Sequence, residues 1–116
     1  VIRGYQPPFA RSLLGLVDSH DTPRFISWCG GDRASLRLAW LVLLTMPGAP
    51  CIYYGDEVGM TGEMDPGCRA AFTWDESRWD HELLATARML IALRHATPRR
   101  DRAATRTQWD ERRPPT

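Results

Sequence analysis

The sequence contains no lysine and no asparagine, so all 15 of its basic residues are arginines. We interpret this bias as the codon usage of a GC-rich genome rather than as phosphate recognition, because 14 acidic residues leave a net charge of only +1. Without an excess of one charge, no overall field favours nucleic acid or an acidic membrane surface as a partner.

Long apolar runs and paired cysteines are also missing. The most apolar stretch, residues 36–46, is shorter than the roughly 20 residues that cross a bilayer. Three cysteines without paired spacing argue against both a disulfide framework and a zinc site. We expect Cys51, inside an apolar run, to be a buried small hydrophobic residue.

The length sets a further limit. With 116 residues, 43% of them hydrophobic, the chain has the size of one modest domain. A complete (β/α)8 barrel needs about 250 residues and at least about 200. The chain is therefore too short to be a whole barrel.

The coarse order of elements is strand, helix, strand, helix. Strands are predicted at residues 13–17 and 50–54, a helix from the N-cap Asp32 to the stop at Pro47, and a second helix over residues 80–95. The first helix is apolar on most sides, so we expect it to be broadly buried. This order predicts a βαβα unit with two parallel strands and two open sheet edges.

Two segments have no helical or strand pattern. Residues 59–74 contain three glycines and a proline, which predicts a long loop, and loops of this length are often functional. Residues 99–116 are rich in Arg, Thr and Pro with almost no aliphatic side chains, so we expect them to be disordered.

Charged side chains follow the first predicted strand directly. Asp18, His20, Asp21 and Arg24 come within seven residues of one another, just after an apolar run. In α/β barrels, the residues past the carboxyl ends of the strands form the reactive mouth. The second strand runs into Asp56 and Glu57 in the same way, so we expect both strand ends at one rim.

Several interpretations of the first strand end are open locally. Ser19, His20 and Asp21 are the residue types of a hydrolase triad, but three consecutive residues do not form that relay. Asp18 and Asp21 either cap backbone amides in a turn, or one of them is a carboxylate of a sugar-cleaving site, where negative charge stabilises an oxocarbenium-like transition state. With three histidines in the chain, we predict no metal site.

At the second strand end we favour structural roles. Asp56 and Glu57 point to opposite sides of an extended chain, so one carboxylate is expected to cap amides and the other to bond a neighbouring barrel residue. Tyr53 and Tyr54 are expected to point apart for the same reason. In the long loop, Trp74 is a candidate for stacking on a sugar.

Asp65 and Arg69 lie four residues apart in the long loop. They form either a local surface ion pair, worth at most about 1 kcal/mol, or a pair of groups that bind vicinal sugar hydroxyls. The local sequence leaves both interpretations open.

Taken together, four segments resemble the α-amylase superfamily, glycoside hydrolase family 13, and most closely its cyclomaltodextrinase, neopullulanase and maltogenic amylase branch. The resemblance runs in order and spacing from about residue 13 to residue 96. The segments are Val17-Asp18-Ser19-His20-Asp21-Thr22-Pro23-Arg24, Cys29-Gly30-Gly31-Asp32, Gly48-Ala49-Pro50-Cys51-Ile52-Tyr53-Tyr54-Gly55-Asp56-Glu57, and Asp65-Pro66-Gly67-Cys68-Arg69 with Phe72 and Trp74-Asp75.

The resemblance implies an α/β fold, part of a (β/α)8 TIM barrel. Residues 1–98 would be the C-terminal part of the catalytic barrel, with strands seven and eight and their helices, and residues 99–116 a disordered or aberrant tail. It also implies that Asp21 stabilises the transition state and that His20 binds the sugar at the cleavage subsite. Asp65 and Arg69 would hold the next sugar, and we add Arg24 to the substrate-binding candidates.

The implied activity is retaining hydrolysis of α-1,4 glucosidic bonds, with α-1,6 bonds as a second class, in maltooligosaccharides, cyclodextrins or pullulan. The nucleophile and general acid of this family follow strands four and five, which we expect N-terminal to Val1, as for most calcium-binding positions of the family. No cofactor is expected in these residues. The branch often forms homodimers, and the resemblance favours a cytoplasmic location. The alternative is an inactive remnant that binds sugar weakly.

Overall fold

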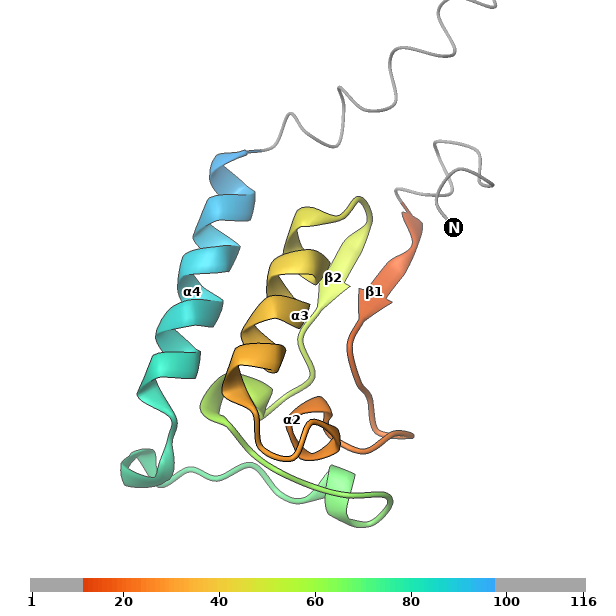
Figure 1. The fold of residues 1–116 in the computed structure, drawn as a ribbon, viewed down its shortest axis with the longest axis vertical. Helices are drawn as coiled ribbons and strands as arrows, with labels where there is room; N and C mark the ends of the chain where they lie inside the picture. Colours follow the sequence, from red (N-terminus) through yellow and green to blue (C-terminus); the bar gives the residue numbers. More distant parts are fainter. Residues whose placement is uncertain (1–11, 98–116) are drawn as a thin grey trace, which may run out of the picture.

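The protein has two short parallel strands beside a pair of long helices, of which the second packs against the first (Figure 1). The computed structural model describes residues 12–97, so the predicted disorder of residues 99–116 lies outside the described residues. Single 3-10 turns lie at residues 56–58, 67–69 and 76–78. The helices and strands, in order, are β1 (Leu14–Leu16), α2 (Phe25–Trp28), α3 (Arg33–Thr45), β2 (Ala49–Cys51) and α4 (His81–Ala96).

The sheet confirms the predicted parallel pairing across a helical crossover. Leu14 lies opposite Ala49, and Leu16 lies opposite Cys51, with α3 connecting the two strands. Both strands are shorter than predicted, because the residues beyond them bond in turns, as when the Asp56 amide donates to the Tyr53 carbonyl. The carboxyl ends of both strands face α2 and the long loop (Figure 1).

Aspartate caps start both long helices. The Asp32 carboxylate accepts from the amides of Ala34 and Ser35, as the sequence predicts, and Asp80 accepts from those of Glu82 and Leu83. An aspartate in this position satisfies amides that have no partner within the helix. These caps fix where α3 and α4 begin.

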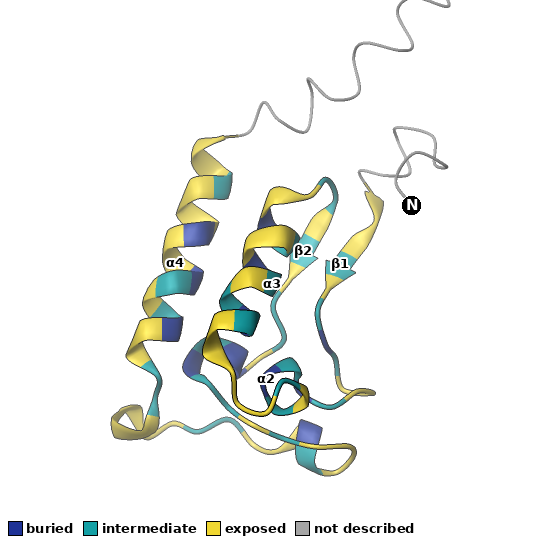
Figure 2. Cartoon of the chain, viewed as in Figure 1, coloured by how far each residue is buried: buried dark blue, intermediate teal, exposed yellow. Residues whose placement is uncertain are grey.

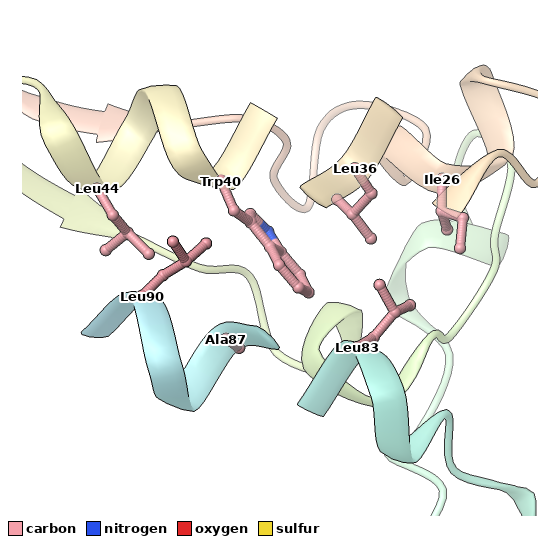
Figure 3. Close-up of a cluster of buried hydrophobic side chains, with 7 residues drawn as sticks. All are labelled: Ile26, Leu36, Trp40, Leu44, Leu83, Ala87 and Leu90. Atoms are coloured by element: carbon pink, nitrogen blue, oxygen red, sulfur yellow. The ribbon is translucent and has the colours of Figure 1, made fainter. Parts of the chain in front are cut away.

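The hydrophobic core lies between α3 and α4 and extends to α2. Figure 3 shows side chains from the two long helices meeting face to face, with Trp40 of α3 in the centre at 1% exposure. Arg94 of α4 joins the far ends of the helices, because its guanidinium donates to the carbonyls of Leu44, Met46 and Gly48. The core residues are Ile26, Leu36, Trp40, Leu44, Leu83, Ala87 and Leu90.

Two expectations about burial are wrong. Helix α3 buries only the side that faces α4, while Leu38, Leu41 and Val42 are 62%, 42% and 50% exposed (Figure 2). Cys51 is exposed rather than buried. In both cases a two-stranded sheet and one neighbouring helix provide too little surface to cover these side chains. None of the helices in residues 12–97 is long and apolar enough to span a bilayer.

Candidate active site

Four exposed polar side chains gather beyond the carboxyl ends of the strands, and we call them the loop cluster: His20, Asp21, Asp65 and Arg69. His20 Nε2 lies 3.3 Å from Asp21 Oδ2, and these two side chains are 63% and 69% exposed. Arg69, half exposed, lies between the two loops. The cluster therefore presents two carboxylates, an imidazole and a guanidinium to solvent.

Arg69 connects the members of the loop cluster. Its Nε donates to the His20 carbonyl at 3.1 Å and lies 3.3 Å from Asp65 Oδ1, while Nη2 lies 3.4 Å from Asp21 Oδ1. The Cys68 thiol, from a fully buried side chain, donates to the same His20 carbonyl at 3.3 Å. Asp65 and Arg69 thus form the local ion pair that was one of the two open interpretations, and Arg69 also contacts the first strand end.

A second set of charges lies beneath the loop cluster, and we call it the buried charge cluster: Asp18, Arg24 and Asp56. These residues are 4%, 0% and 1% exposed. Arg24 Nη1 donates to Asp56 Oδ1 at 2.8 Å and to the Tyr54 carbonyl at 2.7 Å. Asp18 Oδ2 accepts from the Phe25 amide at 2.6 Å, which fixes the start of α2.

The two carboxyl groups of the buried charge cluster interact with each other. Burial and a hydrogen bond with Asp18 raise the pKa of Asp56 to about 8, although Arg24 acts in the opposite direction. Gly55 allows this approach, because its φ of 89° turns the chain sharply after β2 and a side chain there would be strained. Asp56 is therefore a structural residue, as the sequence favours.

Glu57 has the other structural role that the sequence favours. Its carboxylate accepts from the Gly55 amide at 2.7 Å and so closes the turn after β2. Asp18 likewise caps an amide, whereas no backbone amide among the described residues donates to Asp21. The turn interpretation therefore applies to Asp18 but does not account for the exposed position of Asp21.

Tyr53 and Tyr54 do not point apart, so this expectation is wrong. Their rings make an edge contact with centroids 4.6 Å apart, and the Arg24 guanidinium carbon lies 4.8 Å and 4.9 Å from the two ring centroids. Alternation requires an extended strand, and β2 already ends at Cys51. Burial and the neighbouring Tyr54 raise the pKa of Tyr53.

The tyrosine hydroxyls connect the two clusters. Tyr53 donates to the Cys68 carbonyl at 3.3 Å and Tyr54 to the Ala70 carbonyl at 2.8 Å, on either side of Arg69. Nothing in the local sequence predicts this connection. No local signal could have found it, because the partners lie 15 and 16 residues apart in the chain.

Arg24 occupies a different place from the one that a substrate-binding role requires. A side chain with 0% exposure, packed against two tyrosine rings and bonded to Asp56, reaches no ligand outside the protein. We therefore assign Arg24 a structural role. Trp74, by contrast, is 82% exposed, in edge contact with Phe72. Among residues 12–97, no three His, Cys, Asp or Glu side chains group closely enough to hold a metal ion.

Comparison with known proteins agrees with this geometry. The catalytic domain of alpha amylase matches residues 9–114. The chain belongs to the alpha-amylase family. The catalytic domain of this family implies a TIM barrel, and the parallel strands with a helical crossover are part of such a barrel.

Two bacterial enzymes are similar to this chain over most of its length. The chain is 46% identical over 98 residues to a maltogenic alpha-amylase of Bacillus acidopullulyticus, covering 84% of this chain and 17% of that enzyme. It is 46% identical over 94 residues to a cyclomaltodextrinase of Geobacillus thermopakistaniensis, covering 81% and 16%. The chain thus spans about a sixth of the length of these relatives.

A solved structure is also similar to this chain in both sequence and fold. The cyclic α-maltosyl-(1→6)-maltose hydrolase of Arthrobacter globiformis, in complex with its cyclic sugar, superposes with a TM-score of 0.78 at 44% identity. The match covers 81% of this chain and 21% of that enzyme. Sequence and fold therefore agree on a glycoside hydrolase family, and the resemblance seen in the sequence is confirmed.

Proposed function

We propose that this chain forms part of the catalytic barrel of a retaining α-glucan hydrolase, comprising strands seven and eight with their helices. The substrates proposed are α-1,4-linked maltooligosaccharides and cyclodextrins, with the α-1,6 bonds of pullulan as a second class. The observation that carries the proposal is the exposed His20–Asp21 pair, held at the carboxyl end of β1 in a member of this family.

In this proposal Asp21 stabilises the oxocarbenium-like transition state. Its carboxylate accepts hydrogen bonds from sugar hydroxyls, and such contacts strengthen as positive charge develops on the ring. His20, at 3.3 Å from Asp21, orients the same sugar. Asp65 and Arg69, on the facing loop, offer an acceptor and a planar donor to the hydroxyls of the adjacent sugar.

A retaining mechanism also needs a nucleophile and a general acid about 5 to 5.5 Å apart. We propose that other parts of the catalytic domain supply both, since this chain spans only about a sixth of its relatives. Asp21 then acts as a third carboxylate, which does not form a covalent bond with the sugar.

The test is an aspartate-to-asparagine substitution, in a full-length relative, at the position that matches Asp21. We expect kcat to fall by on the order of a hundredfold or more with a much smaller change in KM, because the lost interaction acts mainly in the transition state. The matched control is a glutamate-to-glutamine substitution, in the same relative, at the position that matches Glu57. A rise in KM without a fall in kcat would contradict the proposed role of Asp21.

For these 116 residues alone, a second candidate is an inactive remnant that binds sugar weakly. The exposed Leu38, Leu41 and Val42 favour it, because such a surface invites association rather than catalysis. The assay is hydrolysis of cyclodextrin, pullulan and starch by the purified chain. Turnover would exclude the remnant and would also contradict a nucleophile supplied from outside these residues.

A further inference from the structure

We propose that Asp18, Arg24 and Asp56 form a positioning centre beneath the loop cluster, in which two carboxyl groups share one proton and one guanidinium holds both loops of the site. The proposal rests on the proposed function, since the residue positioned is Asp21. All three side chains are at most 4% exposed, so they act on a sugar only through the residues they hold.

The buried charge cluster contains two carboxyl groups but one guanidinium. Arg24 is the cation of the cluster, and among residues 12–97 it forms an ion pair with Asp56. Asp18 lies within hydrogen-bonding reach of Asp56. Two ionised carboxylates do not hydrogen-bond, and two buried like charges destabilise each other. One proton held between the two oxygens removes this repulsion, so the pair titrates as a unit.

In the part of the chain that the structure describes, the groups around the pair supply no second positive charge. On the same turn, the Glu57 carboxylate is bonded to the Gly55 amide. At the start of α4, Asp80 lies beside Gly59 and pairs with Arg33. From the segment that follows β2, the neighbours are the rings of Tyr53 and Tyr54. A shared proton is therefore what balances the second carboxyl group.

The buried charge cluster also anchors the segment that carries His20 and Asp21. Asp18 and Arg24 stand at the two ends of residues 19–23, the segment that carries His20 and Asp21. Both ends are tied down, because Asp18 accepts from the Phe25 amide and the Arg24 amide donates to the Gly62 carbonyl. The segment is thus anchored at its base on both sides.

The same guanidinium also organises the facing loop. It packs against the rings of Tyr53 and Tyr54, whose hydroxyls hold the carbonyls of Cys68 and Ala70. Arg69, between these two residues, reaches Asp21. Two Arg24 nitrogens, Nε and Nη2, have no hydrogen-bond partner among the described residues, and the aromatic faces partly stabilise the buried charge.

The shared proton predicts a direction of pH dependence. The pKa of Asp56 is raised from 3.8 in the unfolded chain to about 8 in the fold. Its stabilising contribution is therefore fully present below about pH 4 and is lost as the pH rises through about 8. Residues 19–23 should lose order over the same range.

The experiment uses the 116-residue chain and three variants, Asp18→Asn, Asp56→Asn and the exposed control Asp75→Asn. Carboxyl carbons of labelled aspartate are followed by NMR through the pH range, with amide hydrogen exchange in residues 19–23 corrected for intrinsic rate. In the wild type and in Asp75→Asn, one carboxyl should titrate near neutral pH or above, and protection should fall by up to about tenfold for each pH unit between about 4 and about 8 and then level off.

Either cluster variant should abolish that transition, because an asparagine amide donates the shared hydrogen bond at every pH. Protection of residues 19–23 should then be independent of pH. The proposal is overturned if all wild-type aspartates titrate below about pH 5, a result that needs no folded variant. It is also overturned if loop protection stays unchanged while the pair titrates. Neither readout involves sugar cleavage, so failure here is distinct from failure of the proposed function.

Discussion

The buried charge cluster and the loop cluster lie at the same end of the same two strands, yet their surroundings differ. Arg24 is 0% exposed and pairs with Asp56 at 2.8 Å, while Arg69 is 50% exposed and lies 3.3 Å to 3.4 Å from its two carboxylates. Buried pairs resist separation, whereas exposed pairs are screened and exchange partners readily. The comparison teaches that the inner charges hold the rim and the outer charges are free to meet a ligand.

Replacing the buried arginine should have the largest effect. Arg24→Leu should lower the free energy of unfolding by about 3 to 5 kcal/mol, because Asp56 loses its partner inside the protein. Urea unfolding measures the loss. The matched variant Arg69→Leu should cost less than about 1 kcal/mol. Equal losses in the two variants would remove the distinction between the clusters.

A partly buried carboxylate should have an intermediate effect. Asp80→Ala should cost about 1 to 2 kcal/mol, because Asp80 caps α4 and pairs with Arg33. Although burial opposes it, hydrogen bonds from the Leu83 amide and the charge of Arg33 lower the pKa of Asp80 below 3.8. This contribution is therefore present above about pH 4 and is lost as the pH falls through the lowered pKa.

Urea unfolding of the wild type and Asp80→Ala at several acidic pH values measures this dependence. The control is Asp75, which caps the exposed turn at residues 76–78. Asp75→Ala should lower the free energy of unfolding by less than Asp80→Ala does. A difference between wild type and Asp80→Ala that stays constant down to about pH 2 would contradict a contribution from the ionised cap.

The tyrosine hydroxyls offer a way to separate the two clusters. Tyr54→Phe keeps the ring against Arg24 and removes the hydrogen bond to Ala70, so the chain should lose about 1 kcal/mol or less. Hydrogen exchange should show that the amides of residues 68–70 exchange faster, while α3 keeps its protection. Faster exchange throughout the chain would show that the hydroxyl supports the whole fold instead of one loop.

The exposed aspartate should matter least for stability. Asp21→Asn should change the free energy of unfolding by no more than about 0.5 kcal/mol, because its side chain is 69% exposed and bonded only at the surface. Thermal unfolding measures this change. Asp18 follows the same strand but is buried, so Asp18→Asn is the natural comparison and should have the larger effect. A large loss in Asp21→Asn would place Asp21 among the structural carboxylates.

Much of the fold followed from local patterns. The Asp32 cap, the stop before Pro47 and the second helix predicted over residues 80–95 are all confirmed. Each depends on neighbours within one or two helical turns, which is why the sequence alone is sufficient. The structural roles favoured for Asp56 and Glu57 are also confirmed; the Glu57 contact with the Gly55 amide is local, whereas Asp56 bonds Arg24 from 32 residues away.

Burial was harder to predict. The same pattern that identified α3 led to the expectation that Leu38 and Leu41 would be covered, and both are exposed. Arg24 is the opposite case, a charged residue that local reasoning places in solvent and the fold buries completely. Exposure depends on what packs against a side chain, and the amino acids on either side of it do not contain that information.

The sequence by itself determined where α3 begins and stops, because caps and stops depend on short-range chemistry, and it contained the motif around His20 and Asp21 that marks the alpha-amylase family. The parallel pairing of β1 and β2 followed from the order strand, helix, strand. Only the tertiary structure decided that Asp18 and Asp56 meet, that Arg24 packs against two tyrosine rings, and that Arg69 reaches Asp21 across 48 residues of chain. Such contacts arise when the strands pair and bring distant loops to one rim, where burial and charge decide which aspartate is structural and which faces solvent.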